Sequence, residues 1–447
     1  MILGITAIIY VALLILIIWR PPIAMGPVIC MFGIEQWLMA NSGFFRGHGS
    51  LVNLAIGILV LVGLISNTLK GGKIAFYWPA VGWLVVGIHA YYALSFFWAY
   101  SPEWTVSNIY FAGPYTLTVS FAMALLFRDL KDVRLGLLVT VVMAALISIL
   151  LISTTRIHEW GRTIDFGGDI AGTRYDIGRN RGNPLAIADL GAALGGVAMM
   201  LHFPKGNKIW SIVKWGAVFL GFALIFRSGS RGQFVGMVLA VGALYKFSRP
   251  KTNLQTILTM AFSAVLFGGL IWLALTQFGD FGRFDISRFG EAYSESRLSK
   301  CAIVLEEWVR SSPLTWIFGL GGAASWGIQG IYPHVVPVEV LTELGFVGIF
   351  AYVCLLGMVA RTFYRLGKLT TNNPVDRATA AVLATLYLFH WIMSMKQGSF
   401  VLFYHSYFIA ILAARVEWNC RRELRASSRR KAARQQNYRQ GLFVPGS

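Results

Sequence analysis

Runs of about 20 apolar residues recur along nearly the whole chain, and they limit its fold more than any other feature. In lipid, every backbone N–H and C=O group must find a partner within the protein, so such a run is expected to cross the bilayer as an α-helix. Hydrophobic residues make up 56% of the 447 residues and charged residues only 13%, well below the proportion usual in soluble domains. The sequence therefore predicts an all-α, polytopic membrane helical bundle.

The pattern of apolar runs predicts about 12 to 13 transmembrane helices. The predicted spans are 2–19, 23–40, 51–68, 75–99, 107–127, 135–154, 185–203, 210–226, 232–247, 254–276, 334–360, 378–395 and 399–417. We interpret the first run as a helix and not as a signal peptide, because no positive residue precedes it and a second apolar run follows Arg20-Pro21-Pro22.

The distribution of Lys and Arg predicts the orientation of these spans. The tail after the last span is strongly basic, and basic segments stay in the cytoplasm. Alternating backwards from it places every short basic loop on the cytoplasmic side and the N-terminus outside. We therefore expect a transmembrane domain over residues 1–417, an extracytoplasmic loop at 277–333 inserted in it, and a basic cytoplasmic tail at 418–447.

The formal net charge of +19 follows from the same loops and tail. Nucleic-acid binding is not expected, because no basic soluble domain is present to carry it. Membrane lipids are the expected partners of the tail. The four cysteines are scattered without CxxC spacing, so neither a metal site nor a disulfide framework is predicted.

The extracytoplasmic loop contains a segment with helical periodicity. Its apolar residues fall on one stripe, while charged residues lie off it. This pattern predicts an amphipathic helix that rests on the membrane surface or on the bundle. The stripe consists of Leu298, Cys301, Ala302, Leu305, Trp308 and Val309.

Several arginines are exceptions to the rule that Lys and Arg collect in cytoplasmic loops, because the predicted topology places them on the outer side. Arg227 and Arg231 lie in one short turn, while Arg181 and Arg297 lie in the two long outer segments. Long loops follow the charge rule weakly, but a short turn with two cations at the outer membrane edge is harder to explain by chance. These arginines indicate an anionic ligand, and the sequence does not decide between Arg227 and Arg231.

Three predicted spans begin at the same outer face: one after Arg181-Gly-Asn183-Pro184, one after Arg231-Gly232, and one after Tyr332-Pro333-His334. Asn183 followed by Pro184 is typical of an N-cap and a first helical position. Each start directs unpaired N–H groups and partial positive charge outwards, and such groups beside arginine bind phosphate. We hypothesise that the three helix ends converge into a pyrophosphate site.

The third start also carries ionisable side chains. His334 and Glu339 lie near the beginning of an otherwise apolar span, and Glu343 follows Glu339 by four positions, on the same helical face. Ionisable groups at membrane depth are candidates for function. The simpler interpretation is that His334 caps the helix and that both carboxylates are hydrogen-bonded within the bundle.

Together, these segments resemble the O-antigen ligase and O-antigen polymerase family of bacterial envelope glycosyltransferases. Their order and spacing agree over roughly residues 180–350, and the rest of the chain matches only as a series of spans. The matching pieces are Gly182-Asn-Pro184, Ser228-Gly-Ser-Arg-Gly232, Arg297 with Trp308, Pro313-Leu314, Gly319-Leu-Gly321, Pro333-His334 with Glu339, Leu344-Gly345, and Gly348.

The resemblance implies a membrane glycosyltransferase fold and a metal-independent, inverting transferase without a cofactor. The donor would be an undecaprenyl-pyrophosphate-linked glycan. The acceptor would be a glycan, for a polymerase, or lipid A-core, for a ligase. The implied location is the bacterial inner membrane, with the active site facing the periplasm and polysaccharide assembly proteins as further partners. The family's Asn after the histidine is Val335 here.

Carried over to this sequence, the family's catalytic positions are Arg231, Arg297 and His334. The arginines would stabilise the departing pyrophosphate, and the histidine would activate the acceptor or contact phosphate. Glu339 is the alternative base or the group that orients His334. The expected substrate-binding residues are Arg181, Arg227 and Asn183.

Two other functions remain open at this point. One is a transporter or flippase of lipid-linked glycan, and the other is a non-catalytic partner in a polysaccharide assembly complex. A deep charged cavity open to alternate sides would favour transport. An outward groove between the bundle and residues 277–333 would favour transfer.

Overall fold

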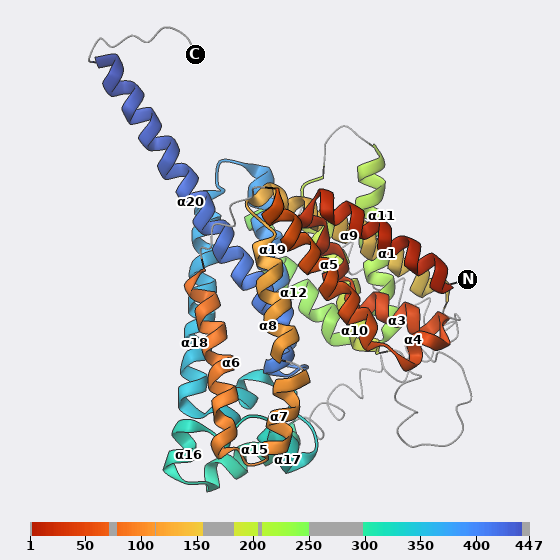
Figure 1. Ribbon diagram of the computed structural model, residues 1–447, viewed down its shortest axis with the longest axis vertical. Coiled ribbons are helices and arrows are strands. Elements are labelled where there is room, and N and C mark those ends of the chain that lie inside the picture. The colour runs from red at the N-terminus through yellow and green to blue at the C-terminus, as the bar shows by residue number, and fades with distance from the viewer. Residues whose placement is uncertain are drawn as a thin grey trace.

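The computed structural model describes residues 2–70, 78–111, 113–154, 183–203, 208–249 and 298–439 (Figure 1). Within these ranges all regular elements are helical and no strand occurs, which confirms the all-α prediction. Six of the described helices are long and apolar enough to cross a membrane, and a bent pair of shorter helices would make a seventh. These helices indicate a multi-pass membrane protein.

The six helices span the chain from its beginning to α18. They are α1 (Ile2–Trp19), α5 (Ser50–Leu69), α6 (Ala80–Leu94) with the turn η2 (Ser95–Trp98), α9 (Leu130–Ser153), α11 (Lys208–Ser228) and α18 (Val336–Leu369). The bent pair joins η1 (Pro21–Ala24) and α2 (Met25–Ile29) to α3 (Met31–Asn41) at an angle of 60°.

The other described helices are shorter or more polar than these six. They are α4 (Gly43–Gly47), α7 (Pro102–Phe111), α8 (Gly113–Leu125), α10 (Pro184–Met200), α12 (Arg231–Ser248), α15 (Ser299–Arg310), α16 (Pro313–Phe318), α17 (Ala324–Gln329), α19 (Pro374–Ser394), η6 (Phe400–Leu402) and α20 (Tyr404–Arg439). Every predicted span contains a helix except 254–276, which lies outside the described residues.

The interior helices explain why more spans were predicted than meet the length and apolarity criteria. α10 has only 17 residues and is buried on nearly all sides. A Cβ added to Gly191 would lie 2.6 Å from the Gly221 carbonyl oxygen, so the backbones of α10 and α11 touch. Small residues allow this close packing of helices in lipid. A helix surrounded by other helices does not contact lipid, so it can be shorter or less apolar than a helix at the bundle surface.

α20 passes through the predicted boundary between membrane domain and tail without a break. It is one helix of 36 residues that extends well beyond the other helices in Figure 1. Its first half is buried in the bundle, and its second half carries exposed arginines such as Arg422 and Arg425. The tail is therefore a continuation of a bundle helix in the residues described.

The predicted amphipathic helix is α15, but its buried face differs from the predicted stripe. The buried residues are Cys301, Val304 and Trp308, which repeat every three to four positions towards α17 and α18. Leu298 and Val309 are more than half exposed, so the face that packs on other helices is shifted from the predicted stripe. The neighbours of this face are α17 of the loop and α18 of the bundle.

α18 contains a break that positions this loop. Gly345 has φ +64° and ψ −162°, a conformation that essentially only glycine adopts. The break frees two backbone carbonyls from the helix ladder. Leu320 N–H donates to Thr342 O and Gly321 N–H donates to Glu343 O, both at 2.9 Å. The turn after α16 therefore docks directly into the interrupted helix.

Replacing Gly345 with alanine tests this break. An added Cβ would overlap the carbonyl oxygen of Ile317 and impose strain, so we expect Gly345→Ala to destabilise the protein by about 2 kcal/mol or more. Thermal unfolding in detergent would measure the loss. Gly357→Ala, on the same helix with open space around the glycine, is the matched control and should unfold at or above the wild-type temperature. Equal unfolding temperatures for the two variants would contradict the docking role of Gly345.

Candidate functional site

Two of the three helix starts that the sequence singled out meet in the structure. The Asn183 side chain accepts hydrogen bonds from the Leu185 and Ala186 N–H groups, so the predicted N-cap of α10 is confirmed. The Ser230 hydroxyl, at the N-cap of α12, donates to the Pro184 carbonyl at 3.4 Å. The N-termini of α10 and α12 are therefore neighbours.

The two arginines of the turn between α11 and α12 have different environments. Arg227 lies in the last turn of α11, and its side chain is completely buried. Arg231 is the first residue of α12 and is half-buried. Arg231 is thus the cation that keeps access from outside the bundle and lies beside the N–H groups of a helix start.

A polar network beside Arg231 was missed by the sequence analysis. Lys396 Nζ donates to Gln233 Oε1 at 2.9 Å, and Gln233 Nε2 donates to Gln397 Oε1 at 2.8 Å. Gln397 Nε2 in turn donates to Asp189 Oδ2 at 3.0 Å. The chain of bonds joins the residues after α19 to α12 and α10. We call Asp189, Gln233, Lys396 and Gln397 the polar network.

Lys396 lies directly over the start of α12. A Cβ added to Gly232 would overlap its ammonium group and the end of its aliphatic stem, so only glycine leaves room for the lysine. Lys396 falls in the gap between two predicted spans, on the side where Arg231 was expected. The argument that singled out Arg231, a cation at the wrong membrane edge, would have found it.

The third helix start connects to the same region through Glu339. Its buried carboxylate accepts hydrogen bonds from the Ser399 hydroxyl and, at 2.9 Å, from the Phe400 N–H. Ser399 lies three residues after Lys396. The segment 395–400 therefore touches α10 and α12 with one end and α18 with the other.

Glu343 holds a different part of the loop. Its buried carboxylate accepts hydrogen bonds from the Ser325 hydroxyl, from the Ala323 N–H at 2.8 Å and from the Ser325 N–H at 3.2 Å. Glu339 and Glu343 are thus hydrogen-bonded within the bundle, as the simpler interpretation expected, but to two separate segments. A role of Glu339 as base or as the group that orients His334 stays a prediction.

His334 precedes α18 in an unusual backbone conformation. Its φ of +65° is left-handed, which few residues other than glycine adopt and which is common at functional sites. The ring is half-buried and meets the Tyr332 ring edge-on at 4.4 Å. Val335 is the N-cap of α18 and supplies no side-chain acceptor, so the helix start lacks the polar cap that asparagine would give.

Two predicted site residues, Arg181 and Arg297, lie outside the described residues. The predicted gathering of Arg231, Arg297 and His334 in one pocket therefore stays a prediction. What the described residues provide is contact between the helices that carry Asn183 and Arg231, and a hydrogen-bonded link from there to the helix that follows His334.

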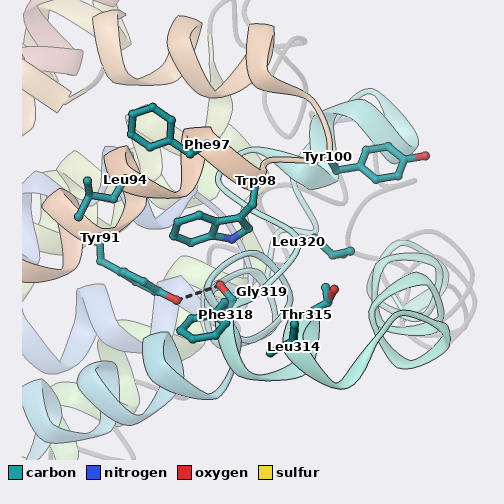
Figure 2. Close-up of a pocket in the computed structure, with 10 residues that line it drawn as sticks. All are labelled: Tyr91, Leu94, Phe97, Trp98, Tyr100, Leu314, Thr315, Phe318, Gly319 and Leu320. Carbon is teal, nitrogen blue, oxygen red and sulfur yellow. Dashed lines mark hydrogen bonds between the residues drawn. The ribbon is translucent and has the colours of Figure 1, made fainter.

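A cavity of about 710 Å³ lies between the bundle and the loop. Figure 2 shows aromatic and aliphatic side chains around it and the Tyr91 hydroxyl donating to the Phe318 carbonyl at 3.0 Å. None of the predicted site residues that the structure describes lines this groove, and its lining is mainly apolar. Its lining residues are Tyr91, Leu94, Phe97, Trp98, Tyr100, Leu314, Thr315, Phe318, Gly319 and Leu320.

Comparison with models of known protein families and with curated proteins gave no match.

The anchoring role of Glu343 predicts a large effect on the loop. Glu343→Ala would leave two backbone N–H groups and the Ser325 hydroxyl without their acceptor, at a cost of about 3 kcal/mol or more. We expect faster limited proteolysis between α16 and α18 and a lower unfolding temperature. Glu306→Ala is the matched control, because Glu306 forms only an exposed ion pair with Arg310 and should change stability little. If Glu343→Ala were cleaved at the same rate as wild type, Glu343 would not anchor the loop.

Proposed function

We propose that this protein is a glycosyltransferase that moves an undecaprenyl-pyrophosphate-linked glycan to an acceptor hydroxyl at the outer face of the bacterial inner membrane. The observation that carries the proposal is the meeting of the α10 and α12 N-termini beside Arg231 and Lys396. The acceptor is a growing glycan in a polymerase or lipid A-core in a ligase.

The charge at this junction fits a pyrophosphate. Two helix N-termini contribute partial positive charge, and Arg231 and Lys396 add two full cations near the same helix end. Within the polar network, Asp189 is the one carboxylate that opposes them. Cations and helix N–H groups gathered at one place attract a dianionic group, and arginine beside helix N–H groups is a common phosphate-binding arrangement.

The reaction assigned to this site is an inverting displacement without a metal. An acceptor oxygen attacks the anomeric carbon while the bond from that carbon to the phosphate oxygen breaks, and the acceptor proton passes to the base. His334 is the proposed base, since imidazole titrates near neutral pH. The pyrophosphate leaves with both electrons of the broken bond, and Arg231 and Lys396 stabilise the charge that develops.

The arrangement of helices supports a shared site. Segment 395–400 bonds to Asp189 and Gln233 at one end and to Glu339 at the other. Glu339 lies five residues after His334. The same short segment thus connects the proposed phosphate-binding side with the proposed acceptor side, which is what coordinated binding of two substrates requires.

The apolar groove supports transfer over transport. It lies between the bundle and the 314–320 part of the loop, and its lining of aromatic and aliphatic side chains fits a lipid chain and not a sugar phosphate. A donor of this class has both parts, a long isoprenoid chain and a charged head. A transporter of the intact molecule would need a polar passage through the bundle.

Purified protein in lipid nanodiscs, supplied with an undecaprenyl-pyrophosphate glycan, should form a product with an acceptor glycan or with lipid A-core. Arg231→Ala should lower kcat/KM by about 100-fold or more, because the leaving group loses a cation. Arg310→Ala is the control, since Arg310 is an exposed arginine at the end of α15 that is paired with Glu306. Glycan appearing inside closed vesicles without any glycosidic product would instead establish a flippase.

The contact between Lys396 and Gly232 suggests a second variant, which distinguishes an effect of the lysine charge on transfer from an effect on stability. In Gly232→Ala the new methyl displaces the flexible lysine end and little else, so the unfolding temperature should stay near wild type. Transfer should fall by about tenfold, as in Lys396→Ala, because the cation leaves the start of α12.

The double variant Gly232→Ala/Lys396→Ala should be no worse than either single change. Additive losses would show that glycine and lysine act separately and would remove Lys396 from the site.

A further inference from the structure

A row of four rings leads across the loop to His334. Trp104 of α7 stacks on Trp326 of α17 with centroids 5.3 Å apart and planes at 22°. Trp326 meets Tyr332 at 6.0 Å, and Tyr332 meets the His334 ring at 4.4 Å. α7 and α17 lie at the same end of the molecule in Figure 1. We call Trp104, Trp326 and Tyr332 the aromatic row.

We propose that the aromatic row is the binding track for the saccharide part of the acceptor, with pyranose rings lying against the ring surfaces that the Trp104–Trp326 stack leaves open, next to His334. This inference rests on the proposed function, and it names the chemistry of the second substrate. Both possible acceptors, a growing glycan and lipid A-core, carry such sugar rings at the reacting end.

The chemistry of the rings favours a sugar. The face of an aromatic ring carries partial negative charge, and it attracts the weakly positive C–H groups that cover one face of a pyranose. Trp104 is 40% exposed, and Trp326 and Tyr332 are half-buried, so the rings are held in place while keeping open surface. The row ends at the residue proposed to activate the acceptor hydroxyl, which gives the track a direction.

The local backbone holds the row rigidly. Gly327, next to Trp326, packs so closely on Ser101 that any added Cβ would overlap the Ser101 hydroxyl. The Thr105 hydroxyl, next to Trp104, donates to the Gly322 carbonyl at 2.5 Å. These two contacts fix α7 and its preceding residue to the loop that Glu343 anchors in α18. A rigid platform of this kind loses little entropy when a ligand binds.

A polar side chain on α17 points to a ligand with hydroxyl groups. Gln329 follows Trp326 by three positions, on the same face of the helix. Within the described part of the chain, both polar atoms of its amide are buried and have no hydrogen-bond partner. Leaving a buried amide unpaired is costly, and sugar hydroxyls can both donate to and accept from it.

Belts of tryptophan and tyrosine also occur where membrane proteins meet lipid headgroups. The aromatic row differs from such a belt in that its last ring contacts His334. Trp83 on α6 is 64% exposed and also contacts another ring, that of Trp78 at 6.0 Å, but it is not part of the row. It therefore serves as the control for an exposed, ring-packed tryptophan.

Transfer kinetics in nanodiscs test the track. Trp326→Ala should raise the acceptor KM by about tenfold while kcat and the donor KM stay near wild type. Trp326→Phe keeps a ring and should restore most of the affinity. Trp83→Ala should change none of these constants. An unchanged acceptor KM in Trp326→Ala, or equal effects of Trp326→Ala and Trp83→Ala, would overturn the proposal.

Gln329→Leu distinguishes a ligand-binding role of the amide from a purely structural one. If the amide serves no ligand, replacing an unpaired buried polar group with leucine should keep or raise the unfolding temperature and leave the acceptor KM unchanged. The track instead requires a raised acceptor KM in a protein that unfolds at the wild-type temperature or above.

A binding experiment separates this proposal from the proposed function. Labelled nanodiscs carrying the full chain are applied to an array of bacterial envelope oligosaccharides, without a donor. Retention by wild type that is lost in Trp326→Ala supports the track even if no transfer is found, and the transferase proposal would then fail alone. No retention of wild type on any saccharide would overturn the track, whatever the transfer assay shows.

Discussion

The interrupted helix α18 is the constraint on which the rest of the loop depends. At Gly345 the helix ladder opens, and the freed carbonyls of Thr342 and Glu343 are taken by the N–H groups of Leu320 and Gly321. A buried carbonyl without a donor would be costly, so the break and the docked turn require each other. The Glu343 carboxylate completes the joint by binding the backbone a few residues further along the loop.

A second joint lies one helical turn earlier on α18. Glu339 holds segment 395–400, and the other end of that segment reaches α10 and α12 through the polar network. Because both joints depend on side chains of one helix, the start of α18 fixes the turn that docks at Gly345 and the residues beside the proposed phosphate site. His334 lies two residues before α18 begins, and its ring contacts Tyr332 of the aromatic row.

The sequence predicted several parts of this site from local rules. The Asn183 cap, the helix starts near Arg231 and His334, and the i, i+4 spacing of Glu339 and Glu343 follow from short-range patterns, and the structure contains them. It did not predict that Arg227 is buried while Arg231 is accessible, because the two are neighbours in one turn. Their difference depends on which helices pack around the end of α11.

What the sequence determined by itself is the helical membrane class, the approximate positions of the long described helices and the presence of cations near helix starts, since hydropathy, caps and charge act within a few residues. Only the tertiary structure brought Lys396 over Gly232, joined Trp104 to Trp326, and paired the break at Gly345 with the turn at Leu320. These contacts connect residues far apart along the chain, and packing in three dimensions decides them.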